Sequence, residues 1–180
     1  MPKLISCPGD QLHEAHRHQV NETSRHEFNV SLPPRHAMAD RLYFLLLEGD
    51  VLLASGFLRR VSPVLLAKDA FSILNIGGLI SNIKGRGYGR EIVLAIRGHL
   101  ATTGDTGLGF CFPRAQGFYE KCGLKVETSS THRFVCIRGE ERHKEQEGQY
   151  IVYQDGKDQF MAKVLANPTV EVLVPDPAMW

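Results

Sequence analysis

The sequence predicts an α/β protein whose sheet contains at least one helical crossover. The first observation is that short apolar runs alternate with amphipathic segments between residues 42 and 138. The second is the composition, 43% hydrophobic and 23% charged, which is typical of a packed globular chain and excludes a wholly disordered one. A length of 180 residues suits one domain better than two. We therefore expect a single domain over residues 1–180, with its core at about 42–138 and a C-terminal extension at about 139–180.

The first part of the chain predicts two short helices and a β-hairpin. The first forty residues are polar and rich in histidine, with weak helical patterns at Leu12–Val20 and Arg35–Arg41. Two apolar runs then follow, Tyr43–Leu47 and Val51–Leu58, separated by a Glu-Gly-Asp turn. They predict paired strands covered on both faces, because their polar and apolar residues alternate poorly. We expect Pro63 to end this hairpin.

A strand and an amphipathic helix are predicted next. Phe71–Ile80 is an apolar run that contains two adjacent glycines, which often mark a bulge or a close approach of a ligand or backbone. After Gly89, the apolar residues Ile92, Ile96 and Leu100 recur every four positions. This spacing predicts a helix with one buried face.

The remaining elements are shorter. We expect a strand at Thr106–Phe112, a short helix at Arg114–Lys121 with Gly123 as its left-handed C-terminal cap, and strands at Leu124–Glu127 and Arg133–Arg138. The mixed-charge run from 138 to 148 predicts a solvated loop. Further strands are expected near 151–153 and 170–174, with a turn at 155–156 between them.

Charge, cysteine usage and hydropathy exclude several classes of protein. The net charge is +1, which gives no overall field for holding nucleic acid or an anionic membrane. The apolar runs are too short to span a bilayer, and the N-terminus becomes polar too early for a signal peptide. The four cysteines contain no C-x-x-C pair, and a histidine group at 13, 16 and 18 fits a polar surface better than a metal site. We expect a cytoplasmic protein without nucleic acid, membrane or metal.

The segment Lys84–Gly89 predicts a site for an anionic ligand. Its three alternating glycines allow sharp backbone turns, and it leads directly into the predicted helix. Helix N-termini present unpaired N–H groups and a partial positive charge, which suit a phosphate or pyrophosphate. Lys84, Arg86 and Arg90 add full positive charges.

Several interpretations of this loop compete. The P-loop pattern is absent, and the dinucleotide-binding G-x-G-x-x-G pattern is incomplete after Gly87. Coenzyme A in an acetyltransferase is a third interpretation, and a plain glycine turn without a ligand is a fourth.

Two segments resemble motifs of the GNAT superfamily of acetyl-CoA-dependent N-acetyltransferases. Leu79–Gly89 (LISNIKGRGYG) is similar to motif A, [QR]-x-x-G-x-[GA], with Lys84 in place of Gln or Arg and with Gly87 and Gly89 at the small positions. Gly117–Leu124 (GFYEKCGL) resembles a later motif with an aromatic-Tyr pair on a short helix. The resemblance implies the GNAT fold, a mixed, splayed central sheet of about six or seven strands flanked by about four helices.

The resemblance also implies a reaction. Acetyl would pass from acetyl-CoA, bound as a cosubstrate, to a primary amine of a small molecule by direct attack in a ternary complex. A non-catalytic CoA-binding regulatory module and a protein or peptide N-acetyltransferase are the alternatives. Because many members of the superfamily form dimers, a homodimer also stays open.

The resemblance assigns the coenzyme to the end of the Phe71–Ile80 strand and the loop after it. A backbone amide at Leu79 or a neighbour would polarise the thioester carbonyl, and loop amides would hold the pyrophosphate. The cofactor-binding residues implied in this way are Gly78, Leu79, Ile80, Lys84, Gly85, Arg86, Gly87, Tyr88, Gly89 and Arg90.

By the same resemblance, Tyr119 is the catalytic acid that protonates the departing thiolate. A phenol with a pKa of about 10 stays protonated at neutral pH and can serve as such a donor. The competing interpretation is that Tyr119, like Phe118, only contributes to the apolar face of a helix. The base that deprotonates the amine stays unassigned, because the strand at 71–80 carries no acid. The candidates are a water relay, His36, Asp40, Glu48 and the terminal carboxylate of Trp180.

The C-terminal Trp180 suggests an acceptor. The chain length, FYEKCGL and a terminal Trp resemble the aminoglycoside 2'-N-acetyltransferases, in which the C-terminus closes on a polycationic sugar, so Trp180 is a candidate substrate-binding residue. A polyamine, an amino acid and a protein N-terminus fit the sequence as alternative acceptors. Among the cysteines, Cys111 is expected to be a buried small apolar residue on a strand.

Overall fold

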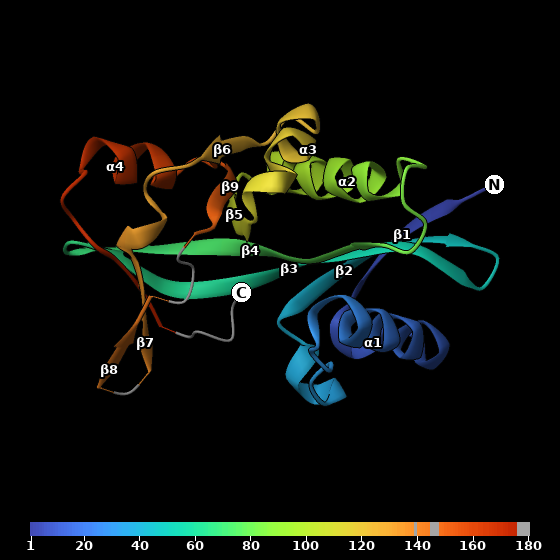
Figure 1. The fold of residues 1–180 in the computed structure, drawn as a ribbon. Coiled ribbons are helices and arrows are strands. Elements are labelled where there is room, and N and C mark those ends of the chain that lie inside the picture. Colours follow the sequence, from blue (N-terminus) through green and yellow to red (C-terminus); the bar gives the residue numbers. More distant parts are fainter. Residues whose placement is uncertain (139, 145–147, 176–180) are drawn as a thin grey trace. The chain divides into compact units, whose positions relative to one another are not determined.

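The chain forms a mixed sheet flanked by helices, which confirms the predicted α/β class. The computed structural model describes residues 1–138, 140–144 and 148–175. These contain ten strands and four α-helices (Figure 1). Two compact units are distinguished, one comprising Met1–Arg59 and Ile76–Ile96, the other comprising Arg60–Asn75 and the residues from Arg97 onward. The organisation as a single domain stays a prediction.

The first unit is built on the predicted hairpin. β2 (Arg41–Glu48) pairs antiparallel with the first part of β3 (Val51–Leu66), so that Tyr43 lies opposite Phe57. The turn between them uses Gly49 in a left-handed conformation, with a φ of 58°. On the other edge of β2 lies β1 (Lys3–Pro8), an antiparallel strand.

Two helices cover the two faces of these strands in the first unit (Figure 1). α1 (Glu14–Phe28) lies on the face where Tyr43 is buried, in a cluster that includes Leu12, Val20, Met38, Leu45, Leu47 and Leu52. The first turns of α2 (Tyr88–Thr103) lie on the other face. There a Cβ at Gly56 would come within 2.9 Å of Ile92 Cγ2, so the missing side chain lets the helix pack closely on β3.

The N-terminal segment differs from the prediction in three places. β1 was not expected, the helix predicted at 12–20 is the longer α1, and the helix predicted at 35–41 is a 3-10 turn at Arg35–Met38. Within α1 only Val20 and Ser24 are buried, so its apolar pattern is weak. Tertiary hydrogen bonds fix it instead, because the Gln19 amide binds the Asp50 carbonyl and the Leu52 N–H at 2.8 Å each.

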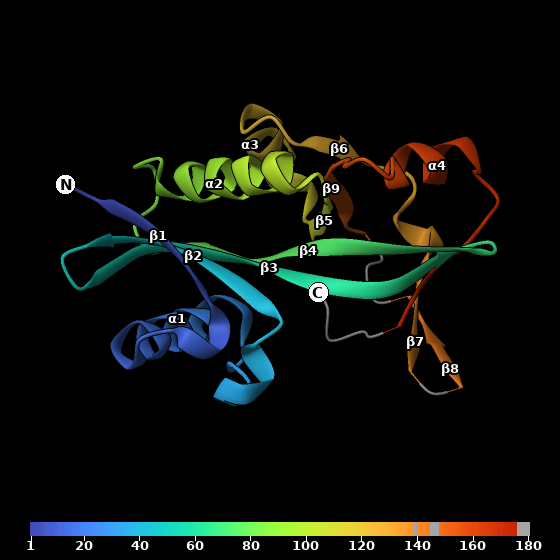
Figure 2. The ribbon, with the colours of Figure 1, turned by 180° about the vertical axis from the view of Figure 1, so that it is seen from behind.

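The second unit contains most of the remaining strands. β4 (Asp69–Ser81) pairs parallel with β5 (Thr106–Cys111) over residues 73–75, and β5 is followed by β9 (Tyr150–Gln154) and β6 (Lys125–Glu127). On the β3 side, β10 (Val172–Val174) pairs with residues 65–66 and with β7 (Phe134–Arg138). β7 forms a hairpin with β8 (Glu141–His143), as Figure 2 shows.

Two helices belong wholly to the second unit, α3 (Gln116–Lys121) and α4 (Phe160–Ala166). The predicted cap of α3 is confirmed, because Gly123 has a φ of 82°. Its N–H donates to the Glu120 carbonyl and the Leu124 N–H donates to the Tyr119 carbonyl, which is the Schellman arrangement. None of the helices in the described ranges is long and apolar enough to cross a membrane.

Three expectations for this part of the chain were wrong or incomplete. Pro63 does not end β3, which continues to Leu66. The charged segment predicted as a loop contains the short strand β8, and α4 was not predicted at all. The strand count exceeds the expected six or seven because β10, β7 and β8 extend the sheet from the free edge of the long β3 strand.

Candidate functional site

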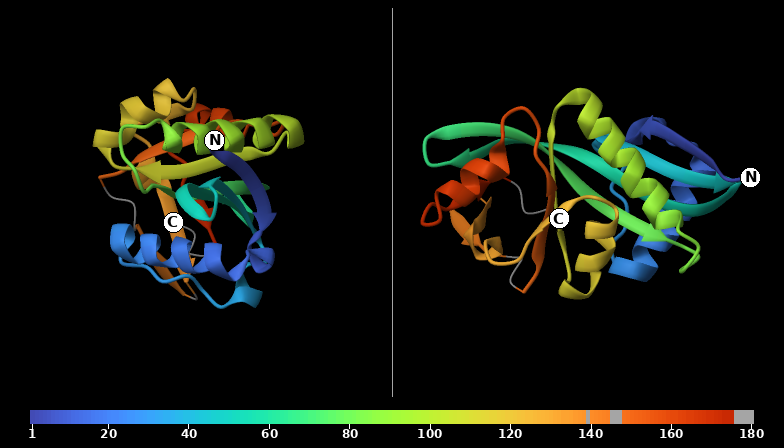
Figure 3. Two further views of the ribbon diagram at one scale, coloured as in Figure 1. Left: turned by 90° about the vertical axis from the view of Figure 1, so that its right-hand side faces the viewer. Right: turned by 90° about the horizontal axis from the view of Figure 1, so that it is seen from above.

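The loop between β4 and α2 connects the end of the strand to the start of the helix (Figure 3), and its glycines have left-handed conformations. Gly85 and Gly87 have φ values of +77° and +80°, which non-glycine residues rarely adopt. A Cβ at either position would meet no atom within 4 Å, so the backbone here faces open space. Glycine is therefore required at both positions by conformation, and it also leaves the backbone accessible to a ligand.

The start of α2 presents unpaired N–H groups beside this loop. The first helical hydrogen bond runs from the Glu91 N–H to the Gly87 carbonyl, at 3.2 Å. The amides of Tyr88, Gly89 and Arg90 consequently lack a partner within the helix. These amides and the positive end of the helix dipole can bind an anionic group such as a phosphate.

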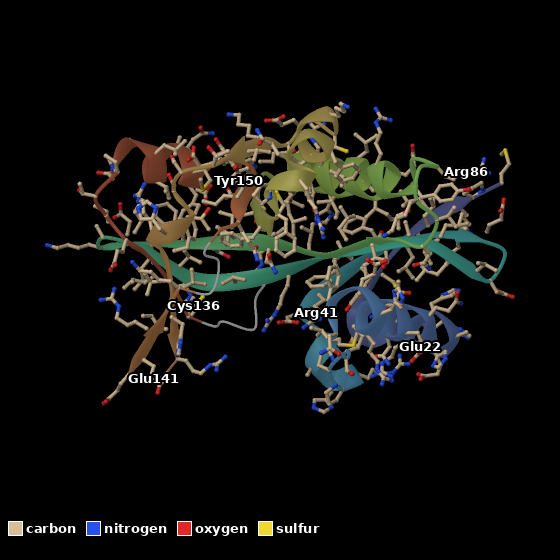
Figure 4. The ribbon with its side chains drawn as sticks, viewed as in Figure 1. Glu22, Arg41, Arg86, Cys136, Glu141 and Tyr150 are labelled. Atoms are coloured by element: carbon tan, nitrogen blue, oxygen red, sulfur yellow. The ribbon has the colours of Figure 1, made fainter. Side chains whose placement is uncertain are left out.

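Three cations surround the loop, and the structure distinguishes their roles. The Lys84 ammonium donates to a carboxylate oxygen of Glu27 on α1, at 3.1 Å. Arg86 and Arg90 are exposed and form no ion pair within the described part of the chain. Figure 4 shows Arg86 at this end of the first unit. Two of the three predicted cations thus remain available to an anion.

The beginning of the loop is fixed to β3 by hydrogen bonds. The Asn82 backbone N–H donates to the Leu53 carbonyl at 2.9 Å, and its side-chain amide donates to the Leu52 carbonyl at 2.7 Å. The Ser81 hydroxyl donates to the Ile83 carbonyl at 2.8 Å. The glycine turn therefore starts from a defined position.

The glycine pair in β4 packs against an aromatic ring. A Cβ at Gly77 would lie 2.6 Å from Phe57 Cζ, and one at Gly78 would lie 2.7 Å from Phe57 Cε1. Gly78 also has a φ of +58°, a left-handed conformation within the strand. The pair therefore permits the close approach of a side chain and a local change in the direction of the strand.

The predicted cofactor-binding residues form one continuous segment of the first unit. It runs from Gly78 on β4 through the glycine loop to Arg90 on α2. Leu79 is half-buried, whereas Ile80 is 3% exposed and packs in the core. In the segment, the backbone of Leu79 and the loop amides are the groups that could contact a coenzyme.

Tyr119 lies on α3 in the second unit and is half-buried. Its ring packs edge-on against Phe118, with the ring centroids 5.1 Å apart. Burial raises the pKa of the Tyr119 phenol well above its usual value, and the neighbouring thiols of Cys111 and Cys122 raise it further. The hydroxyl is therefore protonated at neutral pH, as a proton donor must be.

Among the residues that the structure describes, no general base is assigned. Asp40 is engaged by Arg59, whose Nε lies 2.7 Å from a carboxylate oxygen. Glu48 lies 3.6 Å from the amino group of Met1 at an exposed position, and His36 is exposed on the 3-10 turn. Trp180, proposed both as a base and as a substrate contact, lies outside the described residues.

Cys111 is unsuited to act as a nucleophile. It is 6% exposed on β5, as expected of a small apolar strand residue. Burial raises the pKa of its thiol to about 11, so the reactive thiolate is scarce at neutral pH. No group of three or more metal-ligating side chains occurs in the ranges that the structure describes, and the rings of His13 and His16 lie 5.6 Å apart.

Two contacts of the candidate site were not anticipated from the sequence. One is the ion pair between Glu27 and Lys84, and the other is the contact of Phe57 with Gly77 and Gly78. A regular register from the identified turn would place Gly56 opposite Tyr43, but a bulge between Leu46 and Leu47 shifts the pairing by one residue, so that Phe57 lies there instead. No local pattern signals the Glu27 contact, because its two residues are 57 positions apart.

Comparison with known proteins identifies solved structures that have the same fold. No protein-family model and no curated protein sequence matches the chain. Among solved structures, Escherichia coli ElaA has a TM-score of 0.60 at 13% identity, over 86% of this chain and 100% of that one. An acyl-CoA N-acyltransferase from Pseudomonas aeruginosa has a TM-score of 0.59 at 12% identity, over 86% and 99%. Arabidopsis thaliana NAA60, solved in complex with acetyl-CoA, has a TM-score of 0.54 at 10% identity, over 84% and 98%. The chain shares the fold of these proteins.

Proposed function

We propose that the protein is an acyl-CoA-dependent N-acetyltransferase of the GNAT type, which moves acetyl from acetyl-CoA to a primary amine. The observation that carries the proposal is the loop between β4 and α2. It combines two left-handed glycines facing open space, the amides at the start of α2 that have no partner within the helix, and two exposed arginines. The motif resemblance and the shared fold support the same conclusion.

In this proposal the loop holds the pyrophosphate of the coenzyme. The amides of Gly87 to Arg90 would donate hydrogen bonds to the phosphate oxygens, and the side chains of Arg86 and Arg90 would neutralise their charge. The amide of Leu79 or a neighbour on β4 would donate to the thioester carbonyl as negative charge develops on its oxygen.

The proposed reaction proceeds by direct attack. The neutral amine adds to the carbonyl carbon, which forms the C–N bond, and the C–S bond then breaks. Tyr119 gives its proton to the departing thiolate, and the proton lost by the amine reaches solvent and restores the phenol through water. The raised pKa of the buried Cys111 thiol makes an acyl-enzyme on that residue unfavourable.

A non-catalytic CoA-binding module is the second candidate function. The β4 stretch at residues 71–80 carries no acidic side chain, which favours a site that has lost its base. Both candidates predict that CoA binds and raises the melting temperature.

Release of free thiol from acetyl-CoA in the presence of amines is expected only of the enzyme. A panel of aminoglycosides, polyamines, amino acids and peptides would identify the acceptor class.

Replacing Gly87 with valine is expected to weaken acetyl-CoA binding by about 100-fold or more. The side chain would be strained at a φ of +80° and would project into the open space beside the loop, where the proposal places the pyrophosphate. Isothermal titration calorimetry with acetyl-CoA measures the effect directly.

Gly49→Val is the matched control, because Gly49 has a φ of +58° and also meets nothing within 4 Å, but lies in the hairpin turn. We expect its acetyl-CoA affinity to equal that of the wild type. An absence of binding heat with the wild-type protein would refute the proposed function. Unchanged affinity in Gly87→Val would show that the coenzyme does not use this loop.

A further inference from the structure

The first unit contains a group of arginines around the buried hydroxyl of Tyr43. Arg17 comes from α1 and Arg41 from the first residue of β2, and both side chains are half-buried. Tyr43 is 1% exposed. Figure 4 shows Arg41 on the side of the sheet that α1 covers.

The position of the Arg41 side chain is set by aromatic contacts. Its guanidinium carbon lies 4.9 Å from the centroid of the Phe57 ring, and Nη1 lies 3.5 Å from the Tyr43 hydroxyl. Its Nε is buried without a hydrogen-bond partner, and Arg41 forms no ion pair with any residue that the structure describes. A planar donor group is therefore held in place without the carboxylate that usually accompanies a half-buried arginine.

Arg17 is similarly short of partners. Its Nη2 donates to the Pro33 carbonyl at 3.2 Å, while its Nε is buried without a hydrogen-bond partner in the described chain. Glu14 forms an ion pair with Arg17 through Oε1, which lies 3.6 Å from Nη1, and accepts a closer bond, 2.6 Å, from Arg35 on Oε2. The charges of both Arg41 and Arg17 act on the Tyr43 hydroxyl, where they oppose the increase in its pKa caused by burial.

Among the described residues, neither half-buried arginine has a carboxylate to itself. Arg41 forms no ion pair there, and Arg17 shares Glu14 with Arg35. The nearby carboxylates already pair with another arginine, Glu14 with Arg35 and Asp40 with Arg59. An excess of half-buried positive charge attracts an anion and repels a polycation.

The arginine group is linked to the glycine pair of β4 through one ring. Phe57 contacts the Arg41 guanidinium and also lies against Gly77 and Gly78. Gly78 belongs to the segment proposed to hold the thioester. A small acceptor whose amine reaches this part of β4 would therefore bring a neighbouring substituent to Arg41.

We propose that Arg41 and Arg17 bind a carboxylate of the acceptor, so that the substrate is an amino acid with a free carboxylate. This inference rests on the proposed function for the location of the amine. Guanidinium groups match a carboxylate with paired hydrogen bonds. The polycationic acceptors, aminoglycosides and polyamines, would be repelled by the positive charge of these arginines.

Ligand pairs that differ only in the carboxylate test the inference without relying on turnover. N-acetyl-L-amino acids and their carboxamides mimic the product, and neither carries a titrating amine. By calorimetry, we expect the wild type to bind the acids about 10- to 100-fold more tightly than the amides, as charge-assisted hydrogen bonds predict. In Arg41→Gln and Arg17→Gln this preference should fall to about threefold or less, with amide affinity unchanged.

Arg25→Gln is the matched control, because Arg25 is an exposed arginine on α1 that pairs only with Glu22 within the described residues. Its preference for the acids should equal that of the wild type. Equal affinity for acids and amides in the wild type, or a preference that survives both substitutions, would overturn the inference.

The two proposals fail separately. Transfer to neutral amines or to kanamycin without any preference for carboxylates would refute this inference and leave the acetyltransferase proposal intact. Carboxylate binding that Arg41→Gln abolishes, without thiol release from acetyl-CoA for any amine, would support the carboxylate site but refute both the acetyltransferase and the assignment of the bound amino acid as its acceptor. Far-ultraviolet circular dichroism of each variant reports whether its fold is retained. Because Arg17 lies on α1 and Arg41 lies on β2, Arg17→Gln tests the same carboxylate site without altering β2.

Discussion

Replacing Arg133 with methionine is expected to lower the free energy of unfolding by about 3–5 kcal/mol. The Arg133 side chain is 5% exposed and donates to the backbone carbonyls of Val164, Asn167 and Val170. Methionine keeps the length of the side chain but removes four hydrogen bonds from a charged donor. The Val164 and Asn167 carbonyls keep a backbone N–H donor at 3.2 and 3.1 Å, whereas the Val170 carbonyl loses the guanidinium as its donor. Hydrogen bonds to a charged group contribute about 1.5–3 kcal/mol each, and not all of that contribution is additive.

The loss of stability should be greatest between α4 and β10, the segment whose carbonyls accept the Arg133 hydrogen bonds. Val164 lies on α4, and Val170 precedes β10, which pairs with β7 directly after Arg133. We expect faster amide hydrogen exchange at Val172–Val174 in the variant, together with a lower urea midpoint measured by circular dichroism.

Arg142→Met is the control, because Arg142 forms an exposed ion pair with Glu171 in the same unit. Exposed pairs contribute about 0–1 kcal/mol, so little change is expected. A loss of less than about 1 kcal/mol in Arg133→Met would show that water replaces the guanidinium at those carbonyls, which contradicts the structural role given to it here.

Replacing Tyr119 with phenylalanine is expected to lower kcat by about 10²- to 10⁴-fold, the usual contribution of a positioned proton donor. The variant loses only a hydroxyl, so the affinity for acetyl-CoA should stay within about twofold of the wild type. Thiol release under saturating substrates gives kcat, and calorimetry gives the affinity.

The pH dependence provides a second readout for Tyr119. Because burial and the neighbouring thiols raise the pKa of this phenol, its proton should be retained throughout the range up to about pH 10. Tyr119 should therefore cause no loss of wild-type activity as the pH rises from 7 to about 10.

Tyr153→Phe is the control, since it removes a hydroxyl from a buried tyrosine on β9 in the same unit. Its kcat should equal that of the wild type. A Tyr119→Phe variant with unchanged kcat would exclude the acid role. Equal loss of kcat and acetyl-CoA affinity would instead indicate that Tyr119 only supports the structure.

Elements that are marked by a pattern of neighbouring residues could be predicted accurately from the sequence. Ile92, Ile96 and Leu100 on α2 are each at most 1% exposed, as their four-residue spacing indicated. Gly87 and Gly123 adopt the left-handed conformations expected of a glycine turn and a helix cap. Such features depend on a few neighbouring residues, so one segment contains the information needed to recognise them.

Elements that depend on distant partners could not be predicted in this way. α1 has only two buried residues, and the Gln19 side chain ties it to Leu52, 33 positions later. β8 carries charged residues and is a strand because its backbone pairs with β7. In both cases tertiary hydrogen bonds outweigh a weak local pattern.

By itself, the sequence determined the fold class, the main strands and helices of the core, and the glycine loop at the start of α2. These follow from periodicity and from the backbone freedom of glycine, which are local properties. Only the tertiary structure decided that Arg41 stacks on Phe57 near Tyr43, and that Arg133 reaches carbonyls 31 to 37 positions away. Such contacts depend on strand register and helix packing, which join residues that no local pattern relates.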